Sequence, residues 1–358
     1  MKIGIIDADL ISRKRHRFPN LACMKISAYW KERGAEVSLL LSYDGLENYD
    51  RVFISKVFTG TPVPDGVTEL PNVEYGGTGF FFDKAPNLPD EIEHHFPDYH
   101  LYDEFVFAQI EKGLPRNEFK EFLDYSIGFT TRGCFRKCGF CVNKKYDHVF
   151  QHSPLKEFYD PLRPKICLLD DNFFGYPDWK GVIGELQETG KPFKFKQGLD
   201  ERLLTDEKCE MLCAVKYDGH ITFAFDNVGD YRMIEKKLQQ IRKHTNKQFT
   251  FYVLCGFEST DERDIENVFV RIELLMKYGC IPYIQRFDGY QNSEYRGMYI
   301  TLARWCNQPS FLKKKSFREY AIMANGPGGA AFRYMRDFET AHPDIAARWF
   351  DMKWDDFN

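Results

Sequence analysis

The chain has 358 residues, of which 43% are hydrophobic and 28% are charged, so it can form two or three folded domains and is not disordered as a whole. Its 49 basic and 53 acidic residues give a net charge of −4, which argues against a dedicated nucleic-acid coat or a strongly basic membrane binder. Nucleic acid is therefore not indicated as a partner. No run of about 18 apolar residues predicts a transmembrane helix, so no membrane partner is expected.

The first residues and the cysteine usage predict the compartment. The start, MKIGIIDADL, reaches charged residues too early for a signal peptide. Ten cysteines in this length are too sparse for a secreted disulfide scaffold, and most of them lie in apolar, strand-like segments. We therefore expect a reducing, cytoplasmic location.

Residues 1–105 read as a Rossmann-like α/β domain. Apolar runs at 2–7, 36–42 and 51–58 predict strands, and the spacing of apolar residues over 20–34 predicts a helix between the first two. A strand, a helix and two further strands in this order are typical of a parallel sheet.

A longer alternation follows over residues 120–290. Sequence patterns typical of helices lie between most of the predicted strands. The clearest predicted helix spans 261–278, with a possible capping box at Ser259 and Glu262 and a C-terminal stop at Gly279. This pattern predicts a parallel sheet curled into a partial (β/α)6 barrel, followed by a helical C-terminal region over 291–358. The six strands are predicted at 125–131, 165–171, 192–199, 220–226, 248–256 and 280–287.

Three cysteines lie close together directly after the first strand of this region. Cys134, Cys138 and Cys141 have the spacing C-x3-C-x2-C in a loop that contains glycine and lysine. A loop lets three thiolates point toward one soft metal centre, and three ligands are one short of the usual four for an iron–sulfur cluster. One iron would then remain open to bind another molecule.

A zinc site is the alternative interpretation. Cys138 and Cys141 are followed by His148 and His152, which gives a formal C-x2-C-x6-H-x3-H pattern. The central spacer is shorter than in the usual zinc finger, and Cys134 would be left over. Under this hypothesis the chain is a zinc-stabilised binding module without S-adenosylmethionine (SAM) chemistry.

The C-x3-C-x2-C loop, with the aromatic Phe140 before its last cysteine, resembles that of the radical SAM superfamily. In that family the loop follows the first strand of a (β/α) barrel. The resemblance implies a [4Fe–4S] cluster held by Cys134, Cys138 and Cys141, with SAM bound to the fourth iron. It further implies reductive cleavage of SAM to a 5′-deoxyadenosyl radical, which removes a hydrogen atom from the substrate.

Polar residues follow successive strands, at the edge where parallel α/β barrels carry their chemistry. We predict that the following residues contact SAM: Asp170, Asp171, Asn172, Gln197, Asp200, Arg202, Asp226, Gly256 and Arg286. The family's Gly-Gly-Glu is absent at the second strand, where Asp170, Asp171 or Asn172 could accept hydrogen bonds from the methionine amino group, unless they only form a solvated turn. Arg202 could pair with the methionine carboxylate, or form a salt bridge at a helix start near Thr205.

The later strand ends complete this prediction. Asp226 could bind ribose hydroxyls or substrate, or cap the next turn. Gly256 ends the strand that resembles the one beneath adenine in the family. Arg286 lies in an apolar strand, where a buried guanidinium is costly unless it is paired or faces a polar cavity.

A Rossmann-like domain before such a barrel resembles the cobalamin-binding class of the superfamily, and the pair Gly76 and Gly77 lies where that class has glycines near the corrin tail. The signature Asp-x-His-x-x-Gly would align with residues 7–12, but Asp9 replaces the histidine and Ser12 the glycine. The lower cobalt ligand is therefore missing. We expect a degenerate, cobalamin-binding-like domain, and cobalamin stays an alternative cofactor.

The sequence predicts a radical SAM enzyme with an unknown substrate and an external electron donor such as flavodoxin or ferredoxin. Methyl transfer and other radical modifications share these parts, so no subclass and no catalytic residue are assigned. A basic run at residues 12–17, SRKRHR, is left outside this hypothesis. It could meet phosphate or nucleic acid, or be a solvated loop.

Overall fold

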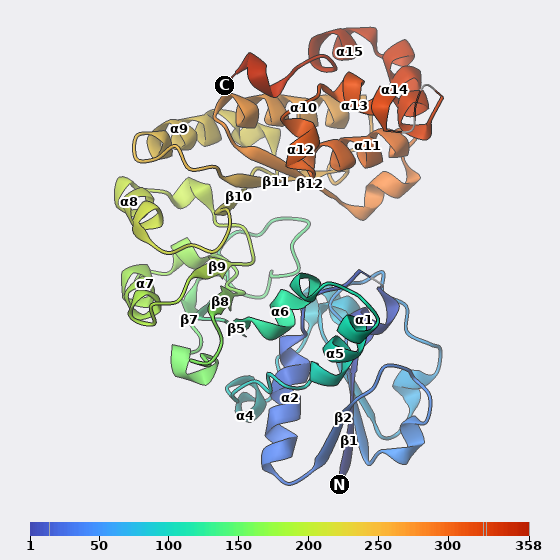
Figure 1. Ribbon diagram of the computed structural model, residues 1–358, viewed down its shortest axis with the longest axis vertical. Coiled ribbons are helices and arrows are strands. Elements are labelled where there is room, and N and C mark those ends of the chain that lie inside the picture. Colours follow the sequence, from blue (N-terminus) through green and yellow to red (C-terminus); the bar gives the residue numbers. More distant parts are fainter. Residues whose placement is uncertain (14, 325, 327, 358) are drawn as a thin grey trace. The chain divides into compact units, whose positions relative to one another are not determined.

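Four parallel strands form the first sheet in the computed structural model, which describes residues 1–13, 15–324, 326 and 328–357 (Figure 1). The order across the sheet is β2–β1–β3–β4, and all three pairings are parallel. The predicted Rossmann-like sheet is therefore present, with a fourth strand that the sequence pattern did not reveal. The strands are β1 (Lys2–Asp7), β2 (Glu36–Leu39), β3 (Arg51–Ser55) and β4 (Val73–Gly76).

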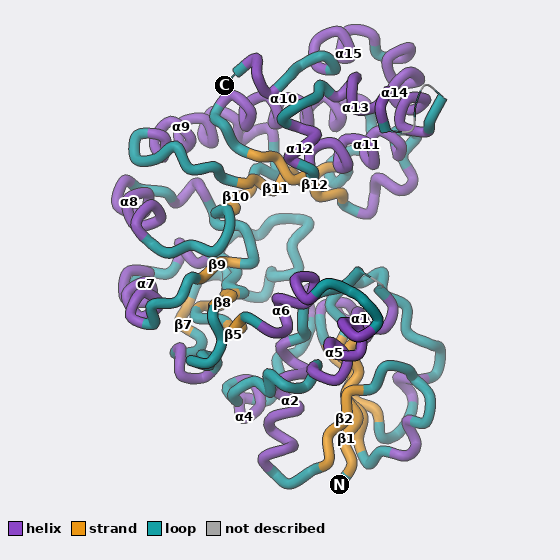
Figure 2. Tube along the Cα trace, viewed as in Figure 1, coloured by secondary structure: helices purple, strands orange, loops and turns teal. Residues whose placement is uncertain are grey.

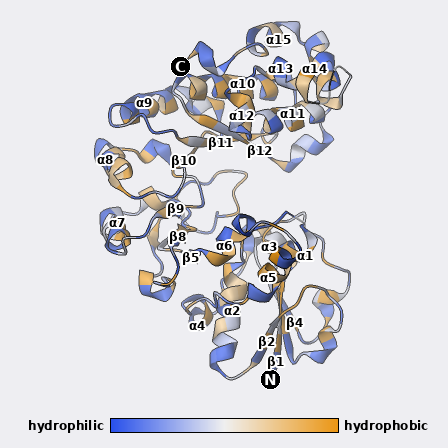
Figure 3. Cartoon of the chain, viewed as in Figure 1, coloured by the Kyte–Doolittle hydropathy of each residue, from blue (hydrophilic) through white to orange (hydrophobic). Residues whose placement is uncertain are grey.

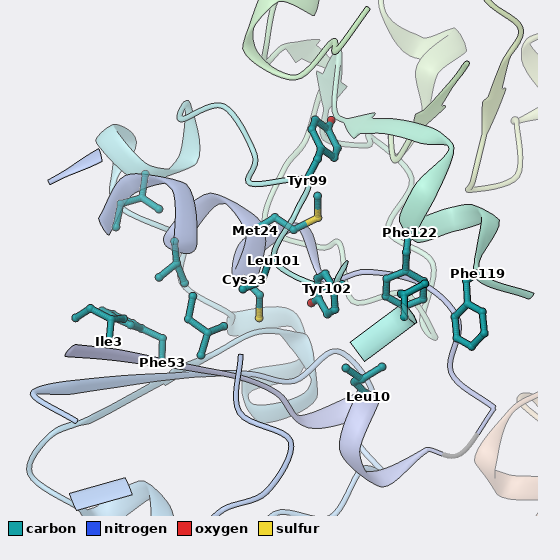
Figure 4. Close-up of a cluster of buried hydrophobic side chains, with 14 residues drawn as sticks. Ile3, Leu10, Cys23, Met24, Phe53, Tyr99, Leu101, Tyr102, Phe119 and Phe122 are labelled. Atoms are coloured by element: carbon teal, nitrogen blue, oxygen red, sulfur yellow. The ribbon is translucent and has the colours of Figure 1, made fainter. Parts of the chain in front are cut away.

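Both faces of this sheet are covered, as parallel sheets require. Ile3 and Ile5 of β1 face the helix α2 (Leu21–Glu32) and the buried aromatic residues of segment 92–123 (Figure 4). Ile6 points to the opposite face and packs with Val52 and Ile54. Alternate residues of β1 thus pack into two separate hydrophobic cores, because successive side chains of a strand point to opposite faces of the sheet.

Short helices connect this sheet to the next one. The segment after residue 86 contains one helical turn, and further short helices precede the second sheet. They are α1 (Ala8–Ser12), α3 (Thr78–Phe81), α4 (Asp90–Glu93), α5 (Asp103–Glu111) and α6 (Lys120–Leu123), with 3-10 turns η1 (Leu46–Asn48), η2 (Val67–Glu69), η3 (Phe82–Lys84) and η4 (Arg116–Phe119).

The second sheet has the order β5–β8–β9 and is also parallel. A separate antiparallel pair, β6 with β7, lies between its first two strands in the chain. Most of the chain between β5 and β8 has no regular secondary structure (Figure 2). The elements are β5 (Tyr125–Gly128), β6 (Thr131–Arg132), β7 (Phe150–Gln151), η5 (Leu155–Glu157), β8 (Lys165–Leu168), η6 (Phe173–Gly175), α7 (Trp179–Glu188) and β9 (Phe193–Phe195).

Buried polar side chains join the two sheets of this first unit. The Tyr99 hydroxyl accepts a hydrogen bond from Ile127 N (2.7 Å) and donates one to Phe158 O (2.6 Å). The buried Arg163 guanidinium donates to Phe122 O (2.8 Å) and to Tyr99 O (2.9 Å). Strand β5 therefore depends on residues outside its own sheet for part of its hydrogen bonding.

The chain divides into two compact units, Met1–Lys196 and Gln197–Asn358. The second unit contains a parallel sheet of order β10–β11–β12, and an isolated parallel bridge joins Leu199 to Phe223 of β10. Its first elements are η7 (Glu201–Leu203), α8 (Asp206–Ala214), β10 (Thr222–Ala224), η8 (Val228–Asp230), α9 (Tyr231–Arg242), β11 (Thr250–Cys255), α10 (Glu262–Lys277) and β12 (Ile281–Arg286).

Helix α10 packs against this sheet through an apolar stripe that includes Ile265, Val268 and Ile272, while its other residues are hydrophilic (Figure 3). Asp261 caps its first turn by accepting from Arg263 N and Asp264 N, both at 3.2 Å. The predicted Ser259–Glu262 capping box is therefore wrong, because Ser259 donates its hydroxyl to Asp261.

The C-terminal region is helical, as predicted. The packing of Trp305, Phe317 and Trp349 gives this region a core of its own beside α10. Its elements are η9 (Asp288–Asn292), α11 (Arg296–Cys306), α12 (Pro309–Leu312), α13 (Phe317–Met323), α14 (Ala330–Ala341), α15 (Pro343–Trp349) and η10 (Trp354–Asp356).

The expected α/β class with parallel sheets and helices is confirmed. All six strands predicted over 120–290 are present, each shorter than its apolar run because the polar ends bend out of the ladder. Three of them belong to the first unit and three to the second. Closure of the six into one barrel, and the boundaries 1–105, 120–290 and 291–358, stay predictions. No helix in the described ranges is long and apolar enough to cross a membrane.

Replacing Tyr99 by phenylalanine should lower the free energy of unfolding by about 2 kcal/mol, because Ile127 N–H and Phe158 C=O would be left without a partner in a buried position. The control is Tyr29→Phe, whose hydroxyl bonds Glu91 at the exposed surface and should change stability by less than about 0.5 kcal/mol. Urea unfolding followed by circular dichroism measures both. Equal stability of the two variants would contradict the role given to Tyr99.

Candidate metal centre

The three cysteines lie in a loop whose two ends are tied together. Strand β6 precedes the loop and β7 follows it, with Thr131 opposite Gln151 and Arg132 opposite Phe150. Gly133 begins the loop with φ +94°, and a Cβ there would come within 2.2 Å of His148 O. Only glycine fits this close crossing of the outgoing and returning chain.

Cys134, Cys138 and Cys141 are half-buried, and none of them forms a disulfide. Arg136 N donates to Cys134 Sγ (3.3 Å), and Asn143 N donates to Cys141 Sγ (3.4 Å). Burial raises the pKa of the Cys141 thiol, and the neighbouring Cys138 and Cys134 raise this pKa further. Backbone N–H groups directed at sulfur stabilise thiolate ligands of iron–sulfur clusters and help set their potentials.

The donor set fits an iron–sulfur cluster in its chemistry. Three cysteines outside any disulfide lie on one loop, and backbone N–H groups donate to Cys134 and Cys141, which is the kind of donor set that a three-ligand cluster needs. In the described part of the chain, however, no three His, Cys, Asp or Glu side chains converge closely enough to hold a metal ion. The roles of Cys134, Cys138 and Cys141 as ligands therefore stay predictions.

Three consecutive residues at the end of β8 hold the start of this loop. The Asp170 carboxylate accepts from Thr130 N (2.9 Å), Thr130 Oγ1 (2.5 Å), Thr131 N (2.8 Å) and Thr131 Oγ1 (2.7 Å). Burial raises the pKa of Asp170 to about 6, although its four donors act in the opposite direction. Since Asp170 is buried and its oxygens are occupied, it is a positioning residue.

The next two residues continue along the loop in register. Asp171 Oδ2 accepts from Gly133 N (2.7 Å) and lies 3.5 Å from Arg132 Nε. Asn172 Nδ2 donates to Cys134 Sγ (3.4 Å). The segment 170–172 thus holds residues 130–134 in sequence order, and we call it the Asp-Asp-Asn clamp. The expectation of a turn with solvated acids is wrong for Asp170, which is buried.

The outer part of the loop is held by lysines. Lys137 Nζ donates to Lys144 O (2.7 Å), and Lys144 Nζ donates to Gly139 O (2.8 Å). Lys145 Nζ reaches Ala85 O (3.3 Å) outside the loop. The Rossmann-like domain thus contacts the far end of the cysteine loop.

The predicted SAM contacts after β9 belong to the second unit. Gln197 is exposed. Asp200 Oδ1 accepts from Arg202 Nε (2.6 Å), and Arg202 Nη1 lies 3.5 Å from Asp230 Oδ2. Arg202 therefore forms the salt bridge that was its alternative interpretation, and Thr205 caps α8 by accepting from Lys208 N at 3.3 Å. These contacts do not test whether the residues meet SAM.

The remaining predicted contacts lie at the ends of β10, β11 and β12. Burial raises the pKa of Asp226 to about 6. Gly256 has φ +72°, and its N–H donates to Asp264 Oδ2 (2.7 Å). Arg286 is exposed, with its guanidinium 4.6 Å from the centroid of the Tyr290 ring. Because Arg286 is exposed, the cost of burying its guanidinium does not arise, and its contact with SAM stays a prediction.

Sequence reasoning missed two buried charged groups of the second unit. Arg271 Nη1 donates to Phe225 O (3.0 Å), Asp226 O (2.8 Å) and Leu254 O (2.8 Å), and so holds the ends of β10 and β11. Burial raises the pKa of Glu201 to about 8. The position of Arg271 within the apolar stripe of its helix could have indicated a buried charge, whereas nothing in the sequence around Glu201 indicated one.

The two histidines of the zinc alternative have other partners. His148 is exposed, with Nδ1 2.6 Å from Asp147 Oδ1. His152 stacks on His94 with a ring centroid distance of 5.0 Å, and its Nδ1 lies 3.0 Å from Ser153 Oγ. Burial, followed by the nearby charges of Arg132 and Lys25, lowers the pKa of His152 to about 3.

The residues aligned with the cobalamin signature do not fit cobalt ligation. Both carboxylate oxygens of Asp9 are occupied: Oδ2 accepts from Val57 N (2.7 Å), and Oδ1 accepts from the Thr61 hydroxyl. Gly77 has φ +104°, and a Cβ there would lie 2.3 Å from Lys56 O. This glycine serves close packing inside the domain, which is a sufficient reason for its presence.

No protein-family model matches the chain, and no curated protein matches it. Among solved structures, the chain is similar to the cobalamin-dependent S-adenosylmethionine radical enzyme OxsB, solved with aqua-cobalamin and S-adenosylmethionine bound. The identity is 14% and the TM-score 0.47, over 98% of this chain and 64% of that chain. This chain thus spans less than two thirds of the neighbour's length. The neighbour is of the class that the sequence resembles.

Replacing Asp170 by asparagine should remove a pH dependence of stability. The folded-state pKa of Asp170, about 6, is above its ordinary value of 3.8, so its contribution is complete below pH 3.8 and is lost as the pH rises through 6. The size of this contribution is roughly 3 kcal/mol. Urea unfolding of the wild type and of Asp170→Asn between pH 4 and 7.5 measures it, and identical pH slopes would refute the assignment.

Replacing Gly133 by alanine should disrupt the cysteine loop, because the new methyl group would collide with His148 O. Gly113→Ala is a matched control, since Gly113 has the same φ of +94° but no atom within 4 Å of an added Cβ. Both variants suffer about 1–2 kcal/mol of backbone strain, and only Gly133→Ala adds the collision. Iron bound after anaerobic reconstitution should fall for Gly133→Ala alone. Equal iron content in both would contradict the steric argument.

Proposed function

We propose that this chain is a radical SAM enzyme in which Cys134, Cys138 and Cys141 would hold a [4Fe–4S] cluster. The observation that carries the proposal is the Asp-Asp-Asn clamp, in which Asn172 Nδ2 donates to Cys134 Sγ at 3.4 Å. The clamp fixes the start of the cysteine loop to the end of a parallel strand, where α/β proteins bind ligands. When bound, the cluster with SAM supplies one-electron cleavage of the sulfonium and a 5′-deoxyadenosyl radical.

The residues of this chain prepare the ligand loop. Asp170 fixes both threonines before the loop, so that Cys134 begins from a defined backbone position. Asp171 holds Gly133 at its strained φ. Arg136 N and Asn143 N donate to the sulfurs of Cys134 and Cys141, and at Cys141 this donor opposes, without cancelling, the burial that raises its pKa.

Asp171 is the residue of the clamp best suited to accept the SAM amino group. Among the described residues only its Oδ2 accepts a hydrogen bond, so Oδ1 keeps its lone pairs for a further donor. Asp170 is unsuited because four donors already occupy it. The contacts predicted for Gln197, Asp200, Arg202, Asp226, Gly256 and Arg286 remain part of this proposal.

The proposal leaves the substrate and the reaction subclass unassigned. The electron would come from a separate donor of the flavodoxin or ferredoxin type. The occupied carboxylate of Asp9 gives no support to a cobalt ligand from this chain, so no methyl-transfer step is assigned.

Alanine at any one of the three cysteines should abolish SAM cleavage. The full chain is purified anaerobically, reconstituted with iron and sulfide, and reduced in the presence of SAM, and 5′-deoxyadenosine is measured by chromatography. The wild type should bind about four irons, and each variant should retain little iron and form no 5′-deoxyadenosine. A Cys134→Ala protein that still cleaves SAM would overturn the proposal.

The matched control replaces both His148 and His152 by alanine. The radical SAM proposal expects this variant to keep its iron and its SAM cleavage. Stoichiometric zinc in the wild type, lost in the histidine variant, with no 5′-deoxyadenosine in either, would favour the binding module instead.

A further inference from the structure

A group of basic side chains lies beyond the end of β1, outside the cysteine loop. Helix α1 follows β1 directly and ends at Ser12, after which Arg13 to Arg17 lead toward α2. Asp7 of β1 pairs in register with Ser55, the last residue of β3, and Phe58 follows β3. In open parallel sheets this carboxyl edge is where ligands bind.

These residues enclose a cleft of about 460 Å³, lined by Arg13, Arg15, His16, Arg17 and Phe58. Lys14 lies outside the described residues. The lining contains basic and aromatic side chains, and the Phe58 side chain is 43% exposed. An exposed ring thus lies beside several cations, in a chain with a net charge of −4.

The two outermost arginines have no counter-ion among the residues that the structure describes. Arg13 and Arg15 are exposed, and neither forms an ion pair with a described residue. Arg17 differs, because its Nε lies 3.5 Å from Glu118 Oε2 and its Nη1 donates to His16 O at 2.8 Å. Glu118 offsets the charge of Arg17 and Asp9 acts on His16, whereas Arg13 and Arg15 repel each other, so an anion beside these two arginines would be stabilised.

The Phe58 ring and the His16 imidazole indicate which groups the ligand has besides an anion. The guanidinium of Arg13 lies 4.2 Å from the centroid of the Phe58 ring, so cation and ring face the same space. Burial lowers the pKa of His16, with smaller contributions from Arg13 and Lys196, so His16 offers a neutral hydrogen-bonding group at pH 7. This set matches a phosphate joined to a flat aromatic ring.

We propose that the cleft binds the phosphate groups of a nucleotide, with Arg13 and Arg15 on the phosphates and Phe58 against the base. Arginine pairs with phosphate through two parallel hydrogen bonds, and bases stack on aromatic side chains. A cleft of this volume is of the size that takes small ligands. The negative net charge argues against an extended nucleic-acid strand as the occupant.

Calorimetry on the full chain tests this, with GDP, inorganic pyrophosphate and guanosine as probes, because none of them shares the adenosine of SAM. GDP and pyrophosphate should bind, and guanosine should bind at least about tenfold more weakly than GDP. Arg13→Gln combined with Arg15→Gln should weaken GDP by about tenfold or more. The control, Arg232→Gln combined with Lys236→Gln, removes the same charge from exposed positions of α9 and should leave GDP binding unchanged.

A second variant separates stacking from charge. Phe58→Ala should weaken GDP binding by about tenfold and leave the affinity for pyrophosphate unchanged. Unaltered GDP binding by the arginine variant would overturn the proposal, and so would a single strand of about 20 nucleotides that binds far more tightly than GDP. The nucleotide proposal does not rest on the radical chemistry. A chain that binds GDP but forms no 5′-deoxyadenosine would support nucleotide binding and contradict the radical SAM proposal.

Discussion

The Asp170 carboxylate is the constraint on which the cysteine loop depends. Two backbone N–H groups and two hydroxyls converge on it in a fully buried position, at the point where the chain leaves β5 and turns toward the cysteines. A buried charge is tolerated only when donors surround it, so the turn at Thr130 and Thr131 has little freedom to rearrange. The geometry of everything after the turn follows from this one side chain.

In the second unit, too, a buried ion bonds backbone groups at the strand ends, but this ion has the opposite charge. Arg271 points its guanidinium at three carbonyls that end β10 and β11, where the first unit points a carboxylate at N–H groups. In both units a buried ion satisfies backbone groups that the sheet ladder leaves open. The strand ends are thereby rigid, which is the property a ligand site needs.

The sequence predicted the parallel sheets, the cysteine loop and the later strands, because periodicity and spacing are local signals. It could not show that Asp170, Asp171 and Asn172 hold three successive parts of one loop, since that depends on the pairing of β5 with β8. It likewise could not show that Arg286 is exposed, because apolar neighbours do not reveal which side of an edge position faces solvent. That Arg13 forms no ion pair with a described residue depends on the folded arrangement, which no local pattern encodes.

The hydrogen bonds of Tyr99 and Arg163 indicate whether the two sheets of the first unit could be separated from each other. Tyr99, in the segment after the first sheet, bonds Ile127 and Phe158, and Arg163, just before β8, bonds Phe122 and Tyr125 in return. The two sheets are thus joined by buried hydrogen bonds that run in both directions along the chain. A domain in this position would stay indispensable to its neighbour even after losing every ligand of its own, because its excision would expose an unfinished protein core.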